Sequence, residues 1–82
     1  MDIKNSVIGI VEKHYKNSKV REISLSGDYL TLVVSNLGGG KMPFVALRIL
    51  RKFPEVRMVH FTGGWIESVY TRNTLRFGGY DI

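Results

Sequence analysis

A chain of 82 residues is expected to form a single domain, because the usual domain has roughly 100–150 residues. Its composition, with 44% hydrophobic and 23% charged residues, is that of a globular protein and excludes a disordered chain. No apolar run approaches the roughly 18 residues of a membrane span, and the absence of cysteine excludes disulfides and thiolate metal sites. The reducing cytoplasm is therefore the expected compartment, and the net charge of +5 favours an anionic partner.

Residues 3–16 have the spacing of an amphipathic helix, in which apolar side chains recur every third or fourth position. The apolar side of this predicted helix holds Ile3, Val7, Ile10, Val11 and His14. Asn17 and Ser18 follow and end the helix. Because His14 lies within the apolar side, we expect a core or interface histidine rather than a metal ligand.

Alternation of apolar and polar residues between Val20 and Val34 predicts a β-hairpin. Its two-residue loop is expected at Gly27-Asp28, because glycine readily adopts the positive φ that such loops require. The positions expected to face the core are Ile23, Leu25, Leu30, Leu32 and Val34.

The second half of the chain has the same order of patterns. After a break at residues 36–40, Pro43 lies in the first turn of a second predicted helix, which ends at about Phe53 before another proline. A second hairpin is expected to turn at Gly63-Gly64, and the tail to add a short strand at Thr74–Phe77. The core side of the second helix holds Val45, Ala46, Ile49, Leu50 and Phe53.

The stretch 20–30 is echoed by the stretch 56–66, with the turn glycine and the following aromatic residue at equivalent positions. Any two hairpins share such alternation, but the coincidence of turn and aromatic residue favours a true duplication. We therefore predict one α+β domain with similar halves at about 1–36 and 41–72 and a tail at 73–82. In the order α-β-β-α-β-β, the two hairpins are expected to form a four-stranded antiparallel sheet. Both helices would cover one face, giving a two-layer sandwich.

The residue types that support catalysis are scattered along the chain, and His60 and Glu67 are the exception. With a loop at Gly63-Gly64, these two side chains would lie directly opposite each other on the outward face of the sheet. Ser68 would point to the other face and cannot complete a triad. An ion pair is therefore the expected role of His60 and Glu67, and we expect no enzyme, no metal ion and no cofactor.

Residues 37–41 join the predicted first hairpin to the second helix with three glycines and Lys41. Backbone N–H groups, the positive end of a helix and a lysine together suit an anion. A Walker A loop is excluded, because its pattern would need a glycine at Ser35 and a hydroxyl residue at Met42. The loop is therefore either a contact for a nucleic-acid phosphate or a simple connector.

Basic residues concentrate in the second half of the chain. Residues 1–40 have a net charge of +1, whereas residues 41–76 have a net charge of +5. A basic helix side beside a glycine-rich loop is typical of phosphate binding, although an ordinary solvated helix face has the same residue types. The exposed phenyl group expected at Phe44 favours the first interpretation, and the alternative for this ring is a staple that packs on the loop. The candidate nucleic-acid-binding residues are Lys41, Phe44, Arg48, Arg51, Lys52, Arg57, Arg72 and Arg76.

The outward face of the sheet is the second candidate surface, because little of the chain remains to cover it. Aromatic residues on an open sheet stack bases in single-strand binders and are also buried in two-fold dimers. The candidate interface or stacking residues are Tyr29, Val33, His60, Trp65 and Val69. These features favour a small basic nucleic-acid-binding protein that forms a homodimer. The alternative is a protein–protein interaction module, such as a small inhibitor or accessory subunit, that uses the open sheet face.

Overall fold

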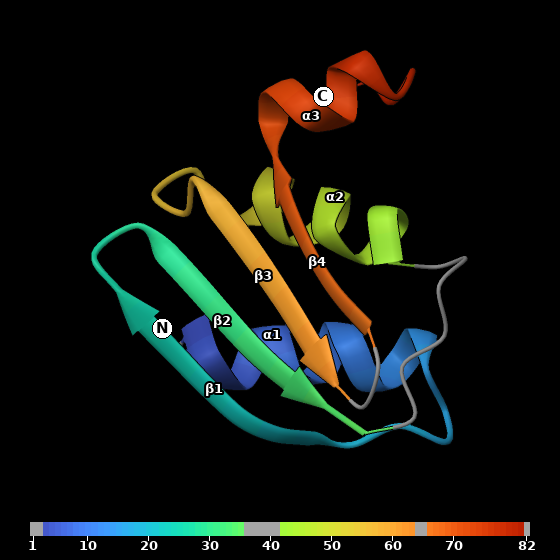
Figure 1. The fold of residues 1–82 in the computed structure, drawn as a ribbon. Coiled ribbons are helices and arrows are strands. Elements are labelled where there is room, and N and C mark those ends of the chain that lie inside the picture. Colours follow the sequence, from blue (N-terminus) through green and yellow to red (C-terminus); the bar gives the residue numbers. More distant parts are fainter. Residues whose placement is uncertain (1–2, 36–41, 64–65, 82) are drawn as a thin grey trace.

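The computed structural model describes residues 3–35, 42–63 and 66–81. Helices and strands within these ranges confirm the α+β class. Figure 1 shows one sheet with α1 and α2 behind it and with α3 beyond the end of β4. The elements are, in chain order, α1 (Ile3–His14), β1 (Val20–Ser26), β2 (Tyr29–Val34), α2 (Met42–Lys52), β3 (Met58–Gly63), β4 (Ile66–Thr71) and α3 (Arg72–Phe77).

The four strands of the described sheet follow the order β1-β2-β3-β4. β1 pairs with β2 and β3 pairs with β4 in antiparallel fashion, as the two predicted hairpins require. The central strands β2 and β3, however, are parallel, with Tyr29 opposite Met58 and Val33 opposite Thr62. The prediction of a fully antiparallel sheet is therefore wrong at its centre.

The position of α2 between β2 and β3 explains this parallel pair. A strand, a helix and a second strand form a crossover when the helix carries the chain back over the sheet to the end where the first strand began. In Figure 1 the chain leaves β2 at one end of the sheet, returns through α2 behind it, and enters β3 beside the start of β2. The connection is right-handed, as nearly all such crossovers are.

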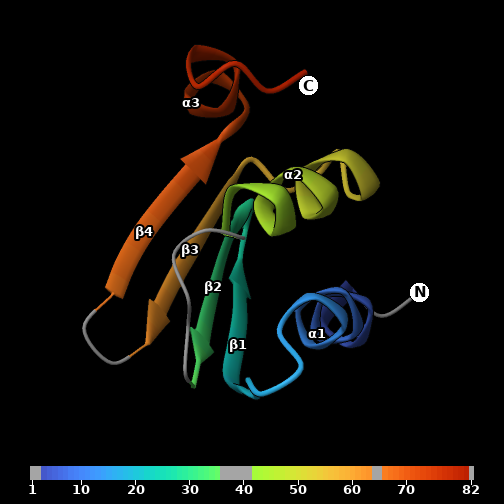
Figure 2. The ribbon, with the colours of Figure 1, turned by 90° about the vertical axis from the view of Figure 1, so that its right-hand side faces the viewer.

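The same topology does not confirm the predicted duplication. From β1 to β2 and from β3 to β4 the chain steps in the same direction across the sheet, but β1 and β3 run in opposite directions. α1 and α2 both lie on one face of the sheet, as Figure 2 shows. Only a half turn about the normal of the sheet keeps the helix of a unit on that face and reverses its strands. The same half turn also reverses the direction in which the chain steps from strand to strand across the sheet. No rotation therefore superposes the two α-β-β units.

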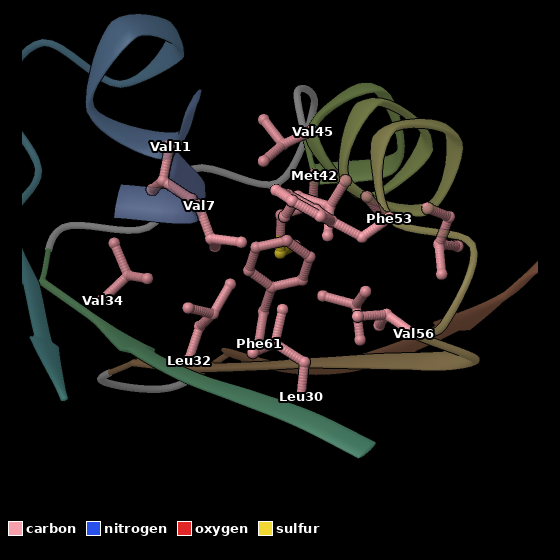
Figure 3. Close-up of a cluster of buried hydrophobic side chains, with 14 of the residues drawn as sticks. Val7, Val11, Leu30, Leu32, Val34, Met42, Val45, Phe53, Val56 and Phe61 are labelled. Carbon is pink, nitrogen blue, oxygen red and sulfur yellow. The ribbon is translucent and has the colours of Figure 1, made fainter. Parts of the chain in front are cut away.

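The core lies between the helices and the inward side chains of β2 and β3, as Figure 3 shows around Phe61. The five positions predicted for the second helix are all buried, four of them in α2 and Phe53 directly after it, and Val7 and Val11 are fully buried in α1. Phe61 has no exposed surface, and its ring meets that of Tyr70 edge to face, with 6.0 Å between the ring centres. The predicted inward positions of the first hairpin are confirmed, since Leu30, Leu32 and Val34 are buried and Ile23 and Leu25 are partly buried against the core.

The position predicted for the first hairpin turn is correct, whereas that predicted for the second is wrong by one residue. In the first, Ser26 pairs with Tyr29 and Gly27 has a φ of 62°, which confirms the loop at Gly27-Asp28. In the second, Gly63 pairs with Ile66, so the loop begins one residue later than predicted. Either glycine can supply a turn conformation, and strand pairing decides between them.

The tail forms a helix where a short strand was predicted at Thr74–Phe77. α3 begins directly after β4 because Thr71 caps it: the Thr71 side chain accepts a hydrogen bond from the Thr74 backbone N–H, and the Thr74 hydroxyl accepts one from the Thr71 N–H. Leu75 is buried and anchors the helix to the core. Gly79, with a φ of 90°, then turns the chain away. The threonine pair is the sequence signal that was missed.

Candidate functional site

The solvent side of α2 carries a basic groove. Because the apolar stripe of α2 faces the core, Arg48, Arg51 and Lys52 lie on the opposite side and are exposed. With Ile10 of α1, they line a groove of about 430 Å³. The sequence predicted these three cations as one group, and the structure brings them together.

The positive charges of this groove are not neutralised by ion pairs in the described part of the chain, where no carboxylate lies within 4.0 Å of their side-chain nitrogens. The Arg51 guanidinium donates a hydrogen bond to the backbone carbonyl of Asp81 in the tail. The Lys52 ammonium lies 5.9 Å from the centre of the Phe53 ring. Neither contact removes a unit of charge, so the groove keeps a strongly positive potential.

Phe44 was predicted to be an exposed contact for nucleic acid, and it is 51% exposed. Its ring, however, meets the ring of Tyr80 edge to face, with 5.4 Å between the ring centres. An edge-to-face pair stabilises the tail against α2. The exposed phenyl group therefore has a structural reason, and it does not by itself indicate a ligand.

Three of the predicted basic residues lie elsewhere, around a second groove of about 380 Å³. Arg57 precedes β3, whereas Arg72 and Arg76 belong to α3. The remaining residues of this groove are Met58, Thr71 and Asn73. The predicted set of cations thus divides into two clusters, one on α2 and one at the junction of β3, β4 and α3.

Arg72 differs from the other cations because its guanidinium is held by backbone carbonyl groups. It donates to the carbonyl of Leu50 at 2.7 Å and to that of Val56 at 2.8 Å. The Leu50 carbonyl belongs to the last turn of α2, where carbonyl groups have no partner within the helix. Arg72 therefore joins the start of α3 to the end of α2. Sequence reasoning missed this role, since nothing local to Arg72 indicates a partner 22 residues away.

Arg57 and Arg76 are the exposed cations of this cluster. The Arg57 side chain is 80% exposed, and its Nε lies 3.6 Å from a carboxylate oxygen of Asp28, whose side chain is 55% exposed. Arg76 donates to the side-chain carbonyl of Asn73 at 3.4 Å. An exposed ion pair such as that of Arg57 with Asp28 contributes little to stability, so the Arg57 guanidinium can change partners at small cost.

The outward face of the sheet holds the second predicted surface, and no described helix covers it (Figure 2). Tyr29, Val33, His60 and Val69 all belong to this face. The rings of Tyr29 and His60 meet edge to face, with 6.2 Å between their centres. Val69, the partner of His60 across the strands, is 45% exposed.

The predicted contact between His60 and Glu67 is confirmed, but their predicted register is wrong. His60 Nε2 lies 2.9 Å from a carboxylate oxygen of Glu67. Because the second turn begins one residue later, His60 is directly opposite Val69, and Glu67 reaches it from the diagonal position opposite Thr62. The face is unchanged, because the pairing shifts by two residues. Ser68 pairs with Phe61 and thus lies on the other face, as predicted.

Two predicted site residues, Lys41 of the glycine-rich loop and Trp65 of the second turn, lie outside the described residues, as do residues 37–40. The prediction of an anion-binding loop at residues 37–41 therefore stays a prediction. The same holds for Trp65 as a member of the sheet surface.

Within residues 3–35, 42–63 and 66–81, no three histidine, aspartate or glutamate side chains gather as a metal site requires. None of the helices in these ranges is long and apolar enough to cross a membrane. Comparisons of the chain with models of protein families, with curated proteins and with solved structures found no match.

Proposed function

We propose that the protein binds the phosphate backbone of nucleic acid through the groove on α2. The observation that supports this function is the cluster of Arg48, Arg51 and Lys52 in one groove, with no carboxylate in the described residues to neutralise them. Concentrated positive charge of this kind attracts polyanions and releases their counterions on binding. Lys41 directly precedes α2 in the sequence and belongs to the same proposal.

The chemistry of the groove suits phosphate better than a small carboxylate ligand. Guanidinium groups bind phosphate oxygens in a bidentate manner, and the lysine adds a point charge. The groove is open along α2, so it can follow a backbone that passes across the surface. Binding of this type depends on charge and not on base identity.

The experiment measures binding of a fluorescent 12-base-pair duplex and a 12-nucleotide single strand between 50 and 200 mM salt. Three neutralised phosphates give a slope of log affinity against log salt of at least about −2.7 on duplex DNA. Arg48→Ala with Arg51→Ala should flatten that slope by about 1.8 and weaken binding to every sequence alike.

The matched control is Lys19→Ala with Arg21→Ala, which removes the same charge at two exposed positions, one directly before the edge strand β1 and one within it. This control separates a local effect of the groove from an effect of net charge. If both double variants lose affinity equally, or if the parent binds neither oligonucleotide, the groove does not have the proposed function.

The open sheet face supports a second proposal, that two copies of the chain associate through it. Val69 is 45% exposed beside the pair formed by His60 and Glu67. Under a two-fold axis the histidine of one copy can face the carboxylate of the other, and the valines can meet between them. A small domain gains buried apolar surface from such pairing.

The test of association is the molar mass in solution. The parent should have about twice the mass of the 9.3 kDa chain at high micromolar concentration, and Val69→Asp should reduce it to that of one chain. Phe77→Asp, at a position that is 92% exposed in α3, is the control and should leave the mass unchanged. A parent that stays at the mass of one chain excludes the homodimer and favours a different protein as the partner of this face.

A further inference from the structure

The groove on α2 has a second wall, which belongs to α1. The two helices contact each other and run in roughly opposite directions on one face of the sheet (Figures 1 and 2). Three cations of α2 line the groove, and the residue of α1 that lines it is Ile10. Because Ile10 is uncharged, the potential on this side depends on its neighbours along the same side of α1.

Lys13 is the cation that α1 places beside Ile10. Residues three positions apart lie on the same side of an α-helix, and helical side chains lean toward the N-terminus. The Lys13 side chain therefore leans back over the turn that holds Ile10. Lys13 is exposed, and no carboxylate of the described residues lies within 4.0 Å of its ammonium group. Its charge is thus available to an anion in the groove.

The acidic residue of α1, Glu12, is directed elsewhere. It lies two positions from Ile10 and therefore on a different side of the helix. Its carboxylate accepts a hydrogen bond from the backbone N–H of Val20, 3.4 Å away at the start of β1. The negative charge of Glu12 thus faces β1 and not the groove, so both walls of the groove present positive charge.

The aromatic rings near α2 are poorly placed to stack bases. Phe53, beside the Lys52 ammonium, is only 5% exposed, and the rings of Phe44 and Tyr80 pack against each other. Among the described residues, those that line the groove include no aromatic ring. Proteins that bind single strands combine a basic groove with rings on which bases stack. A duplex, which presents closely spaced phosphates and keeps its bases inside, is therefore the better match.

We infer that the groove between α1 and α2 receives one backbone of a nucleic-acid duplex, with Lys13 on one wall and the cations of α2 on the other. This inference rests on the proposed function and names its substrate class and a further binding residue. With four cations instead of three, the expected slope of log affinity against log salt on duplex DNA changes from about −2.7 to about −3.6.

The test adds single variants to the binding assay with the 12-base-pair duplex. Lys13→Ala should flatten the slope by about 0.9, so its loss of affinity should be about 3.5-fold larger at 50 mM than at 200 mM salt. Lys13→Arg keeps the charge and should keep the slope of the parent. The matched control is Lys19→Ala, which removes the same charge at an exposed position directly before β1 and should leave the slope unchanged.

The outcomes separate the inference from the proposed function. If Lys13→Ala matches Lys19→Ala while the Arg48 and Arg51 double variant loses affinity, the inference is overturned and the proposed function stands. If the 12-nucleotide single strand binds as tightly as the duplex, the duplex is overturned as the substrate class. If the Arg48 and Arg51 double variant binds as the parent does, the proposed function fails and the inference fails with it.

A second measurement locates the duplex without any substitution. Isoleucine methyl signals in an NMR spectrum report contacts at Ile10, which lines the groove, and at Ile23 of the edge strand β1. Addition of the duplex at 50 mM salt should shift the Ile10 signal more than the Ile23 signal. A shift at Ile10 that does not exceed the shift at Ile23 would overturn the groove between α1 and α2 as the binding site.

Discussion

The two faces of the sheet are built from the same strands, yet one face is buried in the core and the other is exposed. On the covered face, Phe61, Leu30 and Leu32 lie under α1 and α2 and have no exposed surface. On the open face, Val69 keeps 45% of its surface exposed, and the pair of His60 and Glu67 lies beside it. Alternation along a strand assigns residues to faces, but the helix layer decides which face is buried. Stability is therefore expected to depend on one face, and binding on the surfaces that remain.

The largest expected effect contrasts one residue from each face. Phe61→Ala should lower the free energy of unfolding by about 3–5 kcal/mol, because it removes a buried ring and leaves a cavity. Val69→Ala should lower it by less than about 1 kcal/mol when measured at low micromolar concentration. Urea denaturation of both variants checks the contrast. If Val69→Ala lowered the free energy of unfolding as much as Phe61→Ala does, the open face would be buried against a partner.

The next effect concerns Arg72, which joins the helix layer to the end of β4. Arg72→Ala should lower the free energy of unfolding by about 2 kcal/mol, since hydrogen bonds from a charged donor contribute about 1.5–3 kcal/mol. Arg76→Ala, at an exposed position of the same helix, is the control and should change it by less than about 0.5 kcal/mol. Equal effects of the two substitutions would contradict the structural role of Arg72.

A third prediction uses pH to probe the covered side. Burial, with a smaller contribution from Tyr70, raises the pKa of Tyr15 from 10.0 to about 12. Below pH 10 the Tyr15 hydroxyl keeps its proton in both the folded and the unfolded chain, so its ionisation does not lower the free energy of unfolding. Between pH 10 and 12 the unfolded chain loses the proton first, and the free energy of unfolding should fall, by about 1 kcal/mol at pH 11.

The matched variant for this prediction is Tyr15→Phe, because lysines and other tyrosines also titrate in the same range. Urea denaturation at pH 9 and 11 should show a smaller loss of stability in the variant than in the parent. An identical loss in both proteins would mean that the pKa of Tyr15 is the same in the folded and unfolded chains, which would contradict the raised value.

The smallest expected effect lies on the open face. Glu67→Gln removes the charge that faces His60, but the Glu67 side chain is 71% exposed, so the free energy of unfolding should change by less than about 1 kcal/mol. Thermal unfolding at pH 6 and 8 checks this value. A loss above 2 kcal/mol would show that a partner shields the pair from water.

Local patterns predicted the parts of this fold that depend on neighbours in the sequence. The apolar stripe of α2 is buried as expected, and Gly27 turns the first hairpin where predicted. The pairing of Thr71 with Thr74 is also local, and α3 was missed because the capping signal was not recognised. The grouping of Arg48, Arg51 and Lys52 followed from helical spacing alone.

The sequence by itself determined the element types up to β4, the inward faces of α1, α2 and the first hairpin, and the concentration of positive charge in the second half of the chain. Only the tertiary structure decided the parallel pairing of β2 with β3, since it depends on the path of the crossover through α2. It also decided that Arg72 binds the Leu50 carbonyl while Arg57 and Arg76 stay exposed. Periodicity reports which side of an element is apolar, whereas partners distant in the chain are selected by packing, because unpaired buried backbone groups must find a donor or acceptor in space.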